Sequence, residues 1–191
     1  MTGWNGRLVT GLAASGSAIV IALSGCAGDT DNEPKTQAET QGAKTYEGDG
    51  FTLSYPNDWV EVDYEEEPEN VIAATAAFAP KEAGLADSLS LVVGDVEAVS
   101  DSTELVAAAR AEAEASYDEV LSGPTPTTIG GLPAVRLEAS ETGRAGTKLS
   151  IITTIVANGA TWYVLQCEFL PADRDLMESG CNQAMGSFRL E

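Results

Sequence analysis

Residues 149–156 limit the fold of this chain more than any other stretch, because they place apolar side chains on both faces of a predicted strand. The apolar residues divide between the faces as Leu149, Ile151 and Ile155 on one, and Ile152 and Val156 on the other. A strand buried on both faces lies inside a sheet that is covered on both sides. Asn158 and Gly159 form a strong hairpin signal and lead into a strand at 161–170. We therefore expect an α/β chain of the α+β type, an antiparallel central sheet with helices, or a helix and other cover, on its faces.

The rest of the domain supplies further elements for such a sheet. Residues 50–55 alternate apolar and polar side chains as a half-buried strand does, and turn residues at 56–58 lead into a second strand at 59–62. We expect these two strands to pair across a tight corner, with Trp59 as a core residue beneath it. The other expected elements are strands at 71–78, 88–96 and 134–140, a turn at Gly130 and Gly131, and an edge strand or loop at Pro124 and Pro126.

A first helix is predicted to begin at Asp101. The segment 101–104, Asp-Ser-Thr-Glu, is typical of a capping box, in which the Asp101 side chain accepts hydrogen bonds from free backbone N–H groups and Glu104 reaches back. Four residues at four-residue intervals then place one stripe toward the core: Leu105, Ala109, Ala113 and Tyr117. The alanines indicate that this helix lies close to the sheet.

The last helix is predicted to begin near Asp173, which follows Pro171 and suits the N-cap position. Its inward face is predicted to consist of two adjacent stripes: Leu176, Ala184 and Phe188, and Met177, Cys181 and Met185. A disulfide between Cys167 and Cys181 would join this helix to the strand beneath it and contribute about 3 kcal/mol in the chain-entropy description. A redox-active pair is the alternative, although such pairs normally have the spacing Cys-x-x-Cys.

The N-terminus has the layout of a secretory signal. Residues 1–7 carry one positive charge and no negative one, and residues 8–23 are apolar or small. The run ends in a motif that resembles the lipobox of bacterial lipoproteins: Leu23, Ser24, Gly25 and Cys26. We therefore expect signal peptidase II to remove residues 1–25, and diacylglyceryl and acyl chains on Cys26 to anchor the protein in the cell membrane on its extracytoplasmic face. The alternative is an ordinary secreted protein in which Cys26 has no special role.

The segment after the motif is too polar to fold. Residues 27–45 contain no apolar side chain larger than that of alanine, so they cannot bury enough surface to offset the entropy of ordering. We expect the lipidated cysteine and a disordered tether at 26–45, followed by one globular domain at 46–191. A flexible chain of this length has a mean reach of about 25 Å.

Composition excludes several classes of function. The chain contains no histidine, which removes imidazole metal ligands and catalytic triads that depend on histidine, and we expect no cofactor and no metal. Its net charge of -20 argues against nucleic acid as a partner, because phosphate binding requires clustered lysine and arginine. Lipidation of Cys26 would leave two of the three cysteines, an even number that suits a disulfide in an exported protein.

Three short segments resemble a known family. Residues 50–59, GFTLSYPNDW, resemble the opening of PsbP-like domains, in which a phenylalanine-led strand runs into a proline and then a tryptophan. Residues 130–136 resemble that family's turn into a central strand, and residues 185–188 resemble the end of its last helix. With the lipobox and tether, the chain is similar to the LpqN/LpqT-type lipoproteins of actinobacteria. The resemblance implies an α-β-α sandwich and an accessory or binding role in the envelope, and it supplies no catalytic motif.

The leading functional hypothesis is a non-enzymatic envelope lipoprotein that binds a protein partner or an amphipathic lipid. A candidate binding surface lies where Trp59 and Tyr64 meet an acidic run, although a solvated loop is the default interpretation of that run. The acidic residues of the candidate surface are Glu65, Glu66 and Glu67. One alternative is a hydrolase of an envelope ester or glycan that uses a pair of carboxylates with raised pKa values. Another is an assembly factor for a membrane complex.

Overall fold

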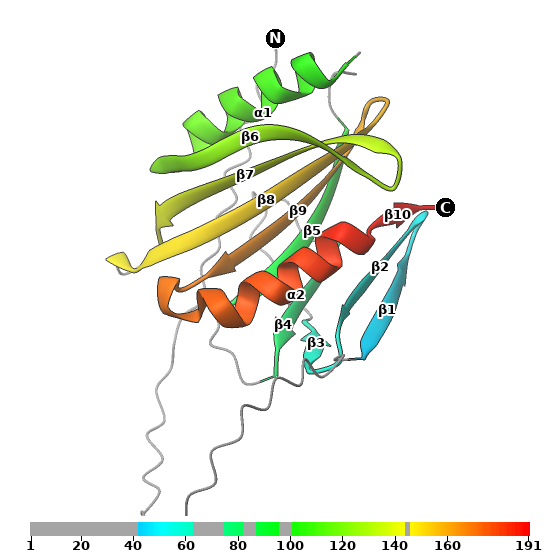
Figure 1. The fold of residues 1–191 in the computed structure, drawn as a ribbon, viewed down its shortest axis with the longest axis vertical. Helices are drawn as coiled ribbons and strands as arrows, with labels where there is room; N and C mark the ends of the chain where they lie inside the picture. The colour runs from blue at the N-terminus through cyan, green and yellow to red at the C-terminus, as the bar shows by residue number, and fades with distance from the viewer. Residues whose placement is uncertain (1–41, 63–74, 82–86, 96–100, 144–145) are drawn as a thin grey trace, which may run out of the picture.

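The computed structural model describes residues 42–62, 75–81, 87–95, 101–143 and 146–191 (Figure 1). The signal segment, Cys26 and most of the predicted tether lie outside these ranges, as do Tyr64 and Glu65 to Glu67. The described residues form three layers, with a large sheet in the middle. This is the arrangement expected for a sheet that contains strands buried on both faces.

The middle layer is an antiparallel sheet of seven strands. Its strands are, in spatial order, β3 (Trp59–Glu61), β4 (Ala76–Pro80), β5 (Ser88–Asp95), β9 (Thr161–Phe169), β8 (Lys148–Asn158), β7 (Leu132–Thr142) and β6 (Glu119–Ile129). β8 lies between two long neighbours and is buried along nearly its whole length. β6, which contains both prolines, is an edge strand, as expected for residues that cannot donate a ladder hydrogen bond.

The two helices cover opposite faces of this sheet. On one face, Leu105 and Ala109 of α1 (Ser102–Ser116) pack with Ile155 of β8. On the other, Met177 of α2 (Arg174–Ser187) packs with Ile152, also of β8. The α2 face is also covered by a small sheet of β1 (Ala43–Gly48), β2 (Phe51–Pro56) and β10 (Arg189–Leu190). The predicted fold class is therefore confirmed. Among the described residues, no helix combines the length and the apolar character that a membrane span requires.

The predicted start of α1 and the first three residues of its predicted inward stripe agree with the structure. The Asp101 carboxylate accepts hydrogen bonds from the backbone N–H groups of Thr103 and Glu104, at 2.7 and 2.9 Å. The predicted inward residues Leu105, Ala109 and Ala113 are buried, and Tyr117 caps the other end of the helix. The capping carboxylate satisfies donors that have no partner within the helix, which is why it fixes the first turn.

The pairing predicted for residues 50–55 and 59–62 is wrong. β2 pairs with β1 and β10, whereas β3 pairs with β4 in the large sheet. The corner at residues 56–58 therefore carries the chain from one sheet to the other instead of closing a hairpin. Trp59 begins β3 beneath this corner, with its side chain buried, as expected for a core residue. The sequence shows the turn between β2 and β3 but does not show which other strands these two pair with.

Two boundaries also differ from the prediction. β1 begins at Ala43, so residues 43–45, which we assigned to the tether, form part of a strand. Lys44 and Tyr46 of β1 are half-buried, whereas Ala43 and Thr45 are exposed. Because the strand contains few apolar residues, its sequence does not show the alternation that predicts a strand. Strand β4 runs from Ala76 to Pro80, somewhat later than predicted, and residues 71–74 lie outside the described ranges.

The last helix is preceded by a 3-10 turn at Pro171–Asp173 and begins at Arg174. The predicted disulfide is present and joins Cys181 of α2 to Cys167 of β9. Leu176 was predicted to face inward, but 51% of its surface is exposed, so this part of the prediction is wrong. The helix turns Met177 and Cys181 toward the sheet, and Leu176, about 100° around the axis from Met177, lies outside that face.

Candidate functional site

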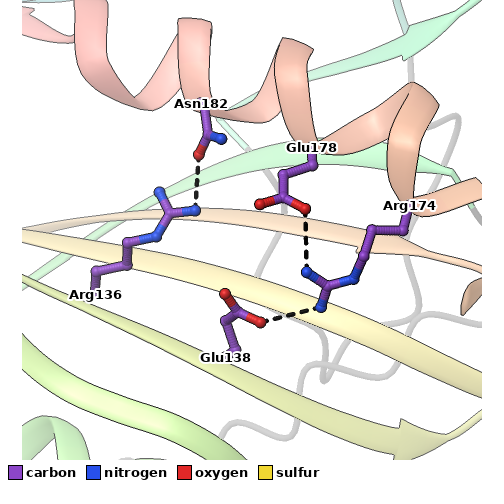
Figure 2. Close-up of polar contacts among 5 residues, drawn as sticks. All are labelled: Arg136, Glu138, Arg174, Glu178 and Asn182. Atoms are coloured by element: carbon purple, nitrogen blue, oxygen red, sulfur yellow. Dashed lines mark hydrogen bonds and ion pairs between the residues drawn. The ribbon is translucent and has the colours of Figure 1, made fainter.

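Five polar residues connect α2 to the neighbouring part of the large sheet, and we call them the arginine clamp: Arg136, Glu138, Arg174, Glu178 and Asn182 (Figure 2). Two residues apart on β7, Arg136 and Glu138 point to the same side of the sheet. Arg174, Glu178 and Asn182 follow at four-residue intervals along one edge of α2. Strand and helix periodicities therefore place two complementary polar rows opposite each other.

The clamp crosses from helix to sheet twice. Arg174 donates to Glu138 on β7 at 3.0 Å and to Glu178 on its own helix at 3.1 Å. Arg136 on β7 donates to the Asn182 amide oxygen at 2.7 Å. The hydrogen bond to Glu138 is the main cause that raises the pKa of Arg174. Because the two ion pairs are partly exposed, each contributes no more than about 1 kcal/mol, so the clamp orients α2 more than it stabilises the fold.

A second polar group lies on the opposite face, where α1 ends. Tyr117 donates from its hydroxyl to the Gln166 side-chain oxygen at 2.8 Å and shares a 3.3 Å hydrogen bond with the Thr153 hydroxyl. Gln166 in turn donates to Glu168 at 2.7 Å. Thr153, Gln166 and Glu168 are all buried. These bonds tie the end of α1 to β8 and β9 through polar groups rather than apolar packing.

Four acidic side chains act electrostatically on Tyr117 or Glu141, and we call them the carboxylate cluster: Glu112, Asp118, Glu168 and Glu141 itself. Burial, together with the charges of Glu168 and Asp118, raises the pKa of Glu141 to about 7. Burial is also the main cause that raises the pKa of Tyr117 to about 12. A Glu141 carboxyl with this pKa is partly protonated at neutral pH, whereas the Tyr117 hydroxyl keeps its proton.

No motif in the sequence predicted these four acids as a site. A signal was present in β9, where Trp162, Val164, Gln166 and Glu168 occupy alternate positions, so that two polar residues continue an inward-facing apolar series. The acids predicted to form a binding surface, Glu65 to Glu67, are instead adjacent in sequence. Acids that meet across β7 and β9 come from distant segments, and no local pattern reveals that they converge.

The residues predicted to bind a partner fall in two groups. Trp59 is a core residue, 1% exposed, so the structure removes it from the candidate binding surface. Its indole lies against Gly180 of α2, and at 1% exposure the side chain is not open to a ligand. Tyr64 and Glu65 to Glu67 lie outside the described residues, as does Cys26. Within the described ranges, no three histidine, cysteine, aspartate or glutamate side chains are grouped so that they could hold a metal ion.

Comparison with solved structures identifies the fold. The solution structure of the PsbP protein of the cyanobacterium Synechocystis, CyanoP, matches with a TM-score of 0.56 at 14% sequence identity, over 83% of this chain and 100% of that one. The crystal structure of LpqN of Mycobacterium tuberculosis, a protein involved in cell envelope biogenesis, matches with a TM-score of 0.54 at 17% identity, over 78% of this chain and 90% of that one. No protein-family model and no curated protein matches the sequence. The chain has a PsbP-like fold.

Proposed function

We propose that this protein is a lipid-anchored protein of the extracytoplasmic face of the cell membrane, where it acts as a non-enzymatic binding or accessory protein of the cell envelope. The observation that carries the proposal is the disulfide between Cys167 and Cys181, which lies in the core of the domain. Structural disulfides form in oxidising compartments outside the cytoplasm. With both of these thiols joined, Cys26 is the remaining cysteine of the sequence, and it follows an apolar run in a lipobox-like motif.

Two further observations support the binding role. LpqN, which shares the fold, is involved in cell envelope biogenesis, although the likeness at 17% identity extends to the fold alone. The sequence also lacks histidine, so the common hydrolase mechanisms that use a histidine base have no residue for that role. A partner would be bound within reach of the membrane, because a tether of about 16 residues, 27–42, would span roughly 20 to 24 Å on average.

The anchor is tested by replacing Cys26 with alanine in the full-length chain. We expect the wild-type protein to fractionate with membranes and to carry the mass of the lipids, whereas Cys26→Ala loses the added mass and nearly all membrane attachment. Ser24→Ala is the matched control, because a small residue at this position preserves the motif. Unchanged membrane attachment and unchanged mass in Cys26→Ala would refute the lipid anchor.

The binding role is tested by crosslinking the acylated protein in intact membranes, purifying it and analysing what accompanies it by mass spectrometry. A specific protein or lipid, enriched over the same preparation of an unrelated lipoprotein, is expected. The absence of any enriched species from repeated preparations would count against the binding role and leave the anchor untouched.

A second candidate, a hydrolase of an envelope ester or glycan, is favoured by one observation, the raised pKa of Glu141 beside Glu168. A carboxyl group with a raised pKa can act as a general acid beside a second carboxylate, without histidine. The candidate predicts that purified protein hydrolyses model esters or glycosides and that Glu141→Gln abolishes this activity. Equal rates for the wild type and Glu141→Gln would eliminate it.

A further inference from the structure

β1 forms the outer edge of the small sheet, where it pairs with β2 on one side and with none of the described strands on the other (Figure 1). The Gly42 carbonyl accepts a 3.2 Å hydrogen bond from the Asn57 N–H, so in this register the even-numbered residues bond to β2. The odd-numbered residues of β1 therefore direct their N–H and C=O groups away from β2, and all three are exposed: Ala43, Thr45 and Glu47.

The other sheet edges offer less to a further strand. A two-residue turn at 130–131 joins β6 to β7, which places Pro126 where its backbone points away from β7, and proline has no N–H to donate. β3 has three residues, and Lys44 donates a 2.7 Å hydrogen bond to the Trp59 carbonyl. β10 has two residues. Proline and short strands limit pairing at edges, whereas β1 contains no proline and is six residues long.

A second copy of β1 fits this edge in a two-fold antiparallel register. With Thr45 opposite Thr45 of the second copy, Ala43 lies opposite the second copy's Glu47, so all three outward residues exchange both backbone hydrogen bonds. The threonine pair is a favourable cross-strand pair. On the inner side, Lys44 lies opposite Tyr46 of the second copy, and no two like charges of β1 face each other. The strand is therefore complementary to itself.

We propose that β1 is a pairing strand, through which two copies of this chain join their small sheets into one antiparallel sheet in the order β10-β2-β1-β1-β2-β10. In this register the two Ala43 residues lie about four residues apart along the strands, or roughly 14 Å. Both tethers therefore leave the pair close together, and each would span roughly 20 to 24 Å, so both copies can be anchored in one membrane. The pairing goes beyond the function proposed above and does not require the lipid anchor.

Charge opposes this association and gives it a recognisable salt dependence. The chain has a net charge of -20, so two copies repel each other. Backbone hydrogen bonds carry no net charge, whereas repulsion between exposed acids is screened by salt. Pairing through β1 should therefore strengthen as salt rises, and an interface built on ion pairs would weaken.

The pairing is tested by cysteine crosslinking of the full-length acylated chain in phosphatidylcholine vesicles. Thr45→Cys should form a disulfide-linked dimer on mild oxidation, because Cα atoms of a hydrogen-bonded antiparallel pair lie about 5.5 Å apart, a distance that a disulfide spans. Thr127→Cys, at an exposed position on β6, is the matched control, and the wild type reports any dimer that forms through Cys26.

We expect about tenfold more dimer from Thr45→Cys than from either control, and more at about 0.5 M than at about 0.05 M salt. Equal dimer yields from all three proteins, or a yield that falls as salt rises, would overturn the proposal. In native membranes, a Thr45→Cys adduct with a different protein and no dimer would assign the edge to another partner and also overturn it.

Further variants test the register. Ala43→Cys alone should crosslink little, because the two copies of this residue lie roughly 14 Å apart, whereas an equal mixture of Ala43→Cys and Glu47→Cys should give the mixed dimer. Thr45→Pro removes an N–H that points away from β2, so it should abolish this mixed dimer and leave the Tm nearly unchanged. Ala43→Cys alone crosslinking as well as the mixture, or a full yield of mixed dimer in the presence of Thr45→Pro, would contradict the pairing.

Discussion

At the residue scale, the contact between Gly180 and Trp59 shows how one missing side chain fixes the relation of two elements. Gly180 lies within α2, and a β-carbon at this position would meet the Trp59 indole. Trp59 begins β3 just after the corner that connects the two sheets. The absence of a β-carbon therefore lets α2 lie directly on the residue that fixes the corner.

Gly180→Ala should destabilise the domain even though alanine is the better helix former. The added methyl group displaces a buried ring, and overpacking of this kind costs about 1 to 3 kcal/mol. Gly186→Ala is the matched control in the same helix, because a β-carbon there meets nothing within 4 Å, and it should leave stability unchanged or raise it by up to about 1 kcal/mol. Urea unfolding of both variants measures the difference, and equal effects would contradict the contact.

At the element scale, α2 is held to the sheet by three different means. Its apolar face packs in the main core with Phe169 and Leu165, the disulfide joins it to β9, and the arginine clamp joins its edge to β7. Arg174 also lies over the Phe169 ring, 5.8 Å from its centre. The first two interactions are buried and supply stability, whereas the clamp is partly exposed and fixes orientation.

Removal of the disulfide should be the costliest change to this helix. The cysteines are 14 residues apart, and opening a loop of this size is expected to lower the free energy of unfolding by about 3 kcal/mol. The double variant Cys167→Ala, Cys181→Ala is compared with reduced wild-type protein in urea unfolding. Both should lose stability, and added reductant should have no further effect on the variant. A variant as stable as the oxidised wild type would show that packing alone fixes α2.

At the scale of the whole molecule, the excess of acidic residues connects folding to pH. The sequence contains 30 aspartates and glutamates against 10 lysines and arginines. Where such acids are exposed, repulsion among them is weak and screened by salt. Glu141 differs because the fold half-buries it beside Glu168, and this raises its pKa from 4.5 to about 7.

The stability of the domain should therefore fall as pH rises between about 4.5 and 7. In this window the folded protein keeps a proton on Glu141 that the unfolded chain has already released, so the folded state loses its advantage as the proton leaves. After allowance for partial exposure, the loss attributable to Glu141 is about 1 to 2 kcal/mol. Urea unfolding at several pH values checks this, and Glu141→Gln should show a correspondingly smaller slope. An identical slope in both proteins would assign the effect to other acids.

Local chemistry determined much of what the sequence established. The Asp101 cap, the hairpin at Asn158 and Gly159, and the two-sided burial of β8 depend on neighbours within a few residues, and each is present in the structure. The antiparallel sheet covered on both faces follows from the last of these. The disulfide could also be predicted from the sequence, because strand alternation and helix periodicity place both cysteines on facing surfaces.

Tertiary structure alone decided which distant segments meet. It sent β2 and β3 into different sheets, buried Trp59 against Gly180, exposed Leu176, and gathered Glu141 and Glu168 around Tyr117. Each outcome depends on strand order and on the angle at which α2 crosses the sheet, and these are set by the packing of the whole core rather than by residues adjacent in sequence. The sequence determined the elements and the two apolar faces of β8, and only the packed molecule determined the surroundings of the acids.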